Sequence, residues 1–76
     1  MMDHDTRVRV LRQIVDEASY RLILGKLTLP DAERLSAQVR NQARLLLPEQ
    51  METYDLIYQS RLSRLIDQFV RPNHLA

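Results

Sequence analysis

The stretch that decides the fold, residues 29–58, reads LPDAERLSAQVRNQARLLLPEQMETYDLIY. Up to Leu47, its apolar residues recur every three or four positions, which is the spacing of one face of an α-helix. Pro48 cannot continue that helix, because proline lacks the backbone N–H and clashes with the preceding turn. The same apolar spacing resumes after Pro48. The sequence therefore predicts two helices, 29–47 and 49–70, joined by a tight turn into an antiparallel hairpin.

A third helix is predicted ahead of the hairpin, over residues 6–24. Asp5 or Thr6 is the expected N-cap, and Gly25, the only glycine, stands where a helix C-terminus favours a left-handed residue. Three amphipathic helices can bury their stripes against one another, so we expect an all-α three-helix bundle. The apolar stripe of residues 6–24 consists of Val8, Leu11, Ile14, Val15, Ala18 and Leu22.

Length and composition limit the organisation of the chain. It has 76 residues, so we expect one small helical domain over 1–76 with frayed ends at 1–4 and 73–76. No apolar stretch approaches the roughly 18–20 residues that span a bilayer, and the beginning of the chain is acidic where a secretory signal would be basic. These features predict a cytoplasmic protein that does not enter a membrane.

Residues for catalysis or metal binding are scarce. The chain has no cysteine, and its two histidines, His4 and His74, lie near its ends, so no base is placed beside a nucleophile. One glycine cannot build a phosphate-binding loop. Asp3 and Asp5 flank His4 as metal ligands could, but we interpret this segment as an acidic start that caps the first helix. We expect a protein that is not an enzyme and has no cofactor and no metal site.

Several apolar residues fall outside the three stripes and indicate a second buried surface. A formal net charge of +1 does not keep copies of the chain apart. We therefore expect a small protein–protein interaction module that forms a homo-oligomer, with a dimer favoured, or binds a helical protein partner. The candidate interaction surface is Val10, Tyr20, Leu24, Leu45, Leu56 and Ile57.

Nucleic-acid binding is the alternative hypothesis. The tight turn at Pro48 is compatible with a helix-turn-helix, and Arg61, Arg64 and Arg71 are predicted to share one flank of the last helix. The sequence pI of about 8.2 is below the value near 9 that is typical of nucleic-acid-binding domains. A solvated face of mixed charge is the favoured interpretation of these arginines.

Overall fold

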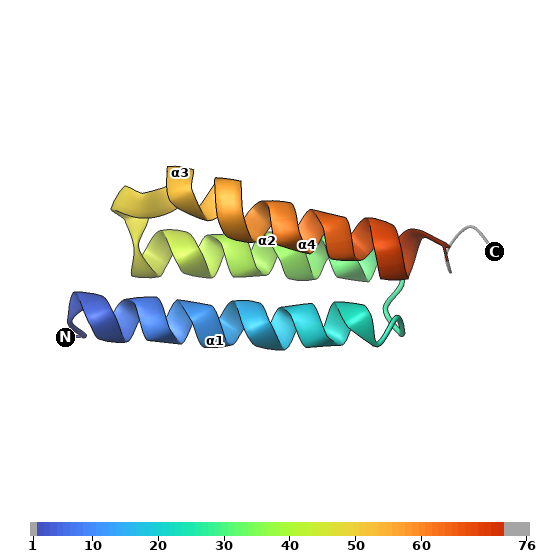
Figure 1. Cartoon of the computed structure of the whole chain (residues 1–76), viewed down its shortest axis with the longest axis horizontal. Helices are drawn as coiled ribbons and strands as arrows, with labels where there is room; N and C mark the ends of the chain where they lie inside the picture. Colours follow the sequence, from blue (N-terminus) through green and yellow to red (C-terminus); the bar gives the residue numbers. More distant parts are fainter. Residues whose placement is uncertain (1, 73–76) are drawn as a thin grey trace.

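The computed structural model describes residues 2–72, and within that range the chain is helical and has no strand (Figure 1). This confirms the predicted all-α class, and three helical rods lie side by side as expected for a bundle. Residues 73–76, predicted to fray, lie outside the described residues. Residues 51–70 form the third rod without a break, and we call them the composite helix. The elements are α1 (His4–Ile23), α2 (Leu29–Leu46), η1 (Pro48–Gln50), α3 (Met51–Tyr54), η2 (Asp55–Gln59), α4 (Ser60–Leu65) and η3 (Ile66–Val70).

The beginning of α1 differs from its predicted position. Asp3 is the N-cap, and its carboxylate accepts a hydrogen bond of 2.8 Å from the backbone N–H of Thr6. This bond satisfies one of the unpaired N–H groups of the first turn and lowers the pKa of Asp3. The predicted cap at Asp5 or Thr6 is therefore wrong, and the helix begins two residues earlier than expected.

The connection between α1 and α2 follows the predicted signals. Gly25 has a φ of 69°, in the left-handed region that glycine enters without a steric penalty. Its N–H donates to the carbonyl of Leu22 at 3.0 Å, which closes the end of α1. The Thr28 hydroxyl accepts a bond of 3.2 Å from the N–H of Asp31 and caps α2, whose first turn holds Pro30.

The turn after α2 confirms the role predicted for Pro48. The helix ends at Leu46, and Pro48 opens the short 3₁₀ turn η1 instead of extending it. Arg7 of α1 donates from Nη1 to the carbonyl of Leu46 at 3.1 Å. A cation at this position satisfies a carbonyl that the helix leaves unpaired and faces the negative end of its dipole.

The composite helix differs from the regular helix predicted over 49–70. It begins at Met51, and two of its segments, η2 and η3, are π-helical. A regular α-helix turns about 100° per residue, so Val70 would lie about 160° away from Tyr54. Both residues are buried, because the wider π turns bring the average to about four residues per turn. The line that faces the core is therefore Tyr54, Tyr58, Leu62, Ile66 and Val70.

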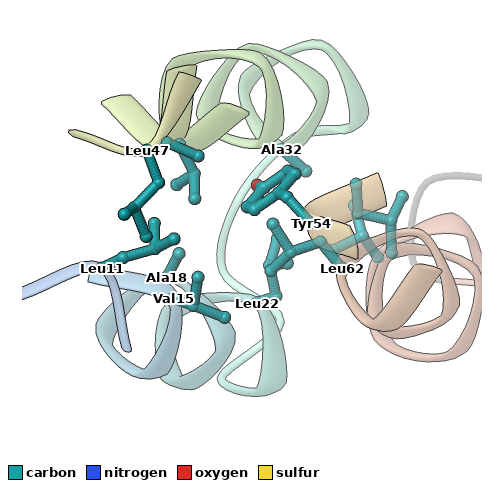
Figure 2. Close-up of a cluster of buried hydrophobic side chains, with 12 residues drawn as sticks. Leu11, Val15, Ala18, Leu22, Ala32, Leu47, Tyr54 and Leu62 are labelled. Atoms are coloured by element: carbon teal, nitrogen blue, oxygen red, sulfur yellow. The ribbon is translucent and has the colours of Figure 1, made fainter. Parts of the chain in front are cut away.

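The core lies between the three rods (Figure 2). Leu22 and Leu62 are its largest fully buried side chains, and the ring of Tyr54 points inward among them. Such a core is stabilised mainly by removing apolar surface from water. Its buried apolar residues are Leu11, Val15, Ala18, Leu22, Ala32, Val39, Ala43, Leu47, Tyr54, Leu62, Ile66 and Val70.

Candidate interaction surface

With about four residues per helical turn, residues four apart in the composite helix line up, and the helix has four lengthwise columns of side chains. One column faces the core, one faces α2, one faces α1, and one points outward. The α2-facing column is Asp55, Gln59, Ser63, Asp67 and Arg71; the α1-facing column is Ile57, Arg61, Leu65 and Phe69; the outward column is Leu56, Ser60, Arg64 and Gln68.

The contact between the α2-facing column and α2 is polar, and we call it the polar seam. Arg40 of α2 donates from Nε and Nη2 to the two carboxylate oxygens of Asp55, at 2.9 and 3.0 Å. Gln59 donates from Nε2 to the hydroxyl of Ser36 at 2.9 Å. The Arg40 guanidinium lowers the pKa of Asp55, and the carboxylate in turn raises the pKa of Arg40. A two-pronged pair of this kind fixes how the two helices are aligned.

The α1-facing column is mostly apolar and contains one ion pair. Arg61 places Nη1 3.9 Å from Oδ1 of Asp16 in α1, and its guanidinium carbon lies 5.7 Å from the centre of the Tyr58 ring. The distance to Asp16 exceeds hydrogen-bond length, and the side chains of Arg61 and Asp16 are 48% and 64% exposed. Both charges are therefore available to a further partner.

Large apolar side chains flank this ion pair. In α1, Tyr20 and Ile23 follow Asp16 by four and seven residues, which places them on the same side of the helix. Both are exposed, as is Ile57 on the composite helix, while Leu65 and Phe69 are half-buried. We call this set the α1–α4 face: Asp16, Tyr20, Ile23, Ile57, Arg61, Leu65 and Phe69.

The candidate surface predicted from sequence does not form one patch. Of its six residues, Tyr20 and Ile57 belong to the α1–α4 face. Leu45 is 84% exposed near the end of α2, Leu56 is 73% exposed on the outward column, and Val10 is half-buried. Leu24 is exposed at the end of α1. These residues come from three different helices, and Val10 and Leu24 are separated along α1, in its first half and at its end.

Sequence reasoning missed four members of the face. Two of them, Leu65 and Phe69, are on the composite helix, and the other two, Asp16 and Ile23, are on α1. Asp16 and Ile23 could have been predicted from their spacing from Tyr20, because residues three and four apart share one side of a helix. Which side of α1 meets the composite helix is set by packing, and that information is not local to α1.

The three arginines predicted to share one flank point in different directions. Arg61 reaches α1, whereas Arg71 binds Asp67 at 2.6 Å and lies 3.8 Å from Glu33 of α2. Arg64 is exposed on the outward column. The regular geometry assumed for the prediction places them together, but the π segment η3 lies between Arg64 and Arg71 and changes the direction of Arg71 relative to the other two.

Tyr54 is a buried polar group in an apolar environment. The residue is 3% exposed, and its hydroxyl has no hydrogen-bond partner among the described residues. Burial raises the pKa of Tyr54 to about 12, and the neighbouring Asp55 carboxylate adds to the shift. The Tyr54 hydroxyl therefore lies inside the core and does not reach water.

The described residues present no other kind of site. Within residues 2–72, no three side chains of His, Cys, Asp or Glu gather as they would around a metal ion. Within the same range, no helix combines the length and the apolar character needed to cross a bilayer.

Comparisons with protein-family models, with curated proteins and with solved structures each returned no match.

Proposed function

We propose that this chain is a small cytoplasmic protein–protein interaction module, not an enzyme, that works by self-association. The observation that carries the proposal is the exposure of large apolar side chains on a bundle of this size. Tyr20, Leu45 and Leu56 each keep more than 60% of their surface in contact with solvent. Covering such side chains on association removes apolar area from water, which is the main source of affinity in most protein interfaces.

The composition of the α1–α4 face supports the same proposal. Interface centres are enriched in aromatic residues and arginine, and Tyr20, Phe69 and Arg61 supply these residue types. The charged groups on this face are a half-exposed ion pair, which does not form the buried acid–base pair that catalysis needs. Binding is therefore the activity that this surface supports best.

The test of the proposal is the mass of the protein in solution. Size-exclusion chromatography with light scattering, over a hundredfold range of concentration, should give a mass that rises from the monomer value of 9.0 kDa to twice that value. A dimer at every concentration would equally support the proposal. A mass of 9.0 kDa at all concentrations would contradict it.

Nucleic-acid binding has weaker support. Arg71 is engaged by Asp67 of the same chain, and the net charge of +1 provides little attraction for phosphates. We expect a labelled DNA duplex titrated with the protein at about 50 mM salt to show no saturable binding. Saturable binding that weakens steeply with salt, and less steeply for Arg61→Ala with Arg64→Ala, would favour the alternative.

A further inference from the structure

The α1–α4 face has a charge pattern that complements itself. The Asp16–Arg61 pair is as loose as the Arg71–Glu33 pair, at 3.9 Å and 3.8 Å, and looser than Arg40–Asp55 at 2.9 Å and Arg71–Asp67 at 2.6 Å. Each of its two charges keeps about half or more of its surface in solvent. A partner that presents an arginine to Asp16 and a carboxylate to Arg61 would therefore satisfy both charges.

A second copy of this chain is such a partner. The chain reverses direction twice, so α1 and the composite helix run in the same direction (Figure 1). A two-fold axis parallel to these helices, in the plane of contact, places α1 of each copy over the composite helix of the other. Asp16 then lies opposite the partner's Arg61, and Arg61 lies opposite the partner's Asp16.

The apolar residues match in the same arrangement. Tyr20 is one turn beyond Asp16, and Leu65 is one turn beyond Arg61. Tyr20 therefore lies opposite the partner's Leu65. About one turn further, Ile23 lies opposite the partner's Phe69. At these two levels apolar side chains meet apolar side chains, next to a pair of opposite charges. Ile57, one turn before Arg61, lies opposite the partner's Arg12 by the same spacing.

The other face-to-face arrangement is unfavourable. A two-fold axis perpendicular to the helices, at the level of the ion pair, would place α1 over α1 and the composite helix over itself. Asp16 would then oppose the partner's Asp16, and Arg61 the partner's Arg61, and like charges opposed across an interface weaken association. The charges thus select the parallel arrangement.

We propose that two copies of this chain dock through their α1–α4 faces, side by side and parallel, with Asp16 of each copy paired to the partner's Arg61. This proposal rests on the self-association proposed above and adds its interface and orientation. The apolar residues supply the affinity, and the charge pairs set the direction.

Charge reversal tests the proposal, because it distinguishes pairing between copies from pairing within one copy. In Asp16→Arg alone, the introduced guanidinium faces the partner's Arg61, and in Arg61→Asp alone, two carboxylates face each other. We expect the dimer dissociation constant of each single variant to rise about tenfold or more. Mixing the two variants should restore a dimer, because every contact between an Asp16→Arg chain and an Arg61→Asp chain is again attractive.

Two controls accompany this experiment. Arg34→Asp also reverses an arginine and breaks an ion pair within the chain, to Asp31 at 3.0 Å, but it lies on α2 outside the face. We expect it to leave the dissociation constant within about twofold of wild type. Circular dichroism checks that all variants keep the helical content of wild type, and the double variant Asp16→Arg with Arg61→Asp should dimerise by itself.

Two results would contradict the proposed interface, and both can be told apart from a failure of the proposed self-association. Single variants that dimerise as well as wild type would show that another surface mediates self-association. If the two single variants remain monomeric when mixed, their weaker dimerisation is not caused by the loss of Asp16–Arg61 pairs between copies. If wild type itself is a monomer throughout, the proposed function fails first.

Discussion

The two flanks of the composite helix contrast in what they contact. On the side of α2, the polar seam joins the helices through the two-pronged Arg40–Asp55 pair and the Gln59–Ser36 hydrogen bond. On the side of α1, the column is mostly apolar, and its single ion pair is 3.9 Å long. One helix thus presents a polar flank to its neighbour in the hairpin and an apolar flank beside α1.

The two kinds of contact have different effects: the polar contacts fix how the helices are aligned, and the apolar contacts stabilise the fold. Partly exposed ion pairs contribute little to the free energy of folding, since water competes for the charges. Their directional bonds instead fix the relative position of α2 and the composite helix. Apolar burial contributes most of the stability, and the apolar side chains that remain exposed are available for association.

The largest effect is expected from the apolar core. Leu22 is fully buried, so Leu22→Ala removes apolar contacts and leaves a cavity, and should lower the free energy of unfolding by about 2–5 kcal/mol. Urea denaturation followed by circular dichroism measures this loss. Leu24→Ala, at an exposed site two residues away, is the matched control and should change stability by less than about 0.5 kcal/mol. Equal losses would contradict the assignment of Leu22 to the core.

A smaller effect is expected at alkaline pH, from Tyr54. Its pKa is about 12 in the folded protein, above the ordinary value of 10, so the folded state keeps a proton that the unfolded state loses. Stability should therefore be unchanged by this group below pH 10 and fall by up to about 2.5 kcal/mol as pH rises toward 12. Urea denaturation at several pH values measures the slope. Tyr54→Phe should flatten this dependence of stability on pH, because it removes the titrating hydroxyl.

Tyr54→Phe has a second expected consequence. It removes a buried hydroxyl that has no hydrogen-bond partner among the described residues, while it keeps the ring. The variant should be at least as stable as wild type at neutral pH, by up to about 1 kcal/mol. A clear loss of stability at neutral pH would contradict the absence of a partner for this hydroxyl.

The smallest effect is expected in the polar seam. Arg40 lowers the pKa of Asp55, so the pair stabilises the fold above the ordinary carboxyl pKa and loses this contribution as pH falls through the lowered value. Asp55→Asn should reduce stability at neutral pH by less than Leu22→Ala does. The difference between the variant and wild type should shrink as the solution is acidified. Acid titration of stability that runs parallel for the two proteins would contradict a stabilising pair.

Local sequence signals were sufficient to predict the architecture. Pro48 and Gly25 mark the two turns by their backbone chemistry, and the apolar spacing identifies three helices. The cap at Asp3 was missed because several polar residues in a row can each serve as an N-cap.

The surface could not be predicted to the same extent. A regular helical angle predicts one set of directions for the side chains, whereas the π segments η2 and η3 rotate every later residue of the composite helix. This rotation separates Arg61 from Arg71. The proximity of Asp16 and Arg61 depends on how two distant helices pack, which no local spacing encodes.

The distance between two copies of one labelled site tests the central claim most directly. The chain has no cysteine, so Lys26→Cys in the turn between α1 and α2 provides a unique position for a spin label at one end of the bundle. Pulsed electron resonance on the concentrated protein should give an interspin distance well below the 45 Å length of the molecule, because a parallel pair brings the same ends together. A distance near or above that length, or no coupling between labels, would contradict the parallel dimer.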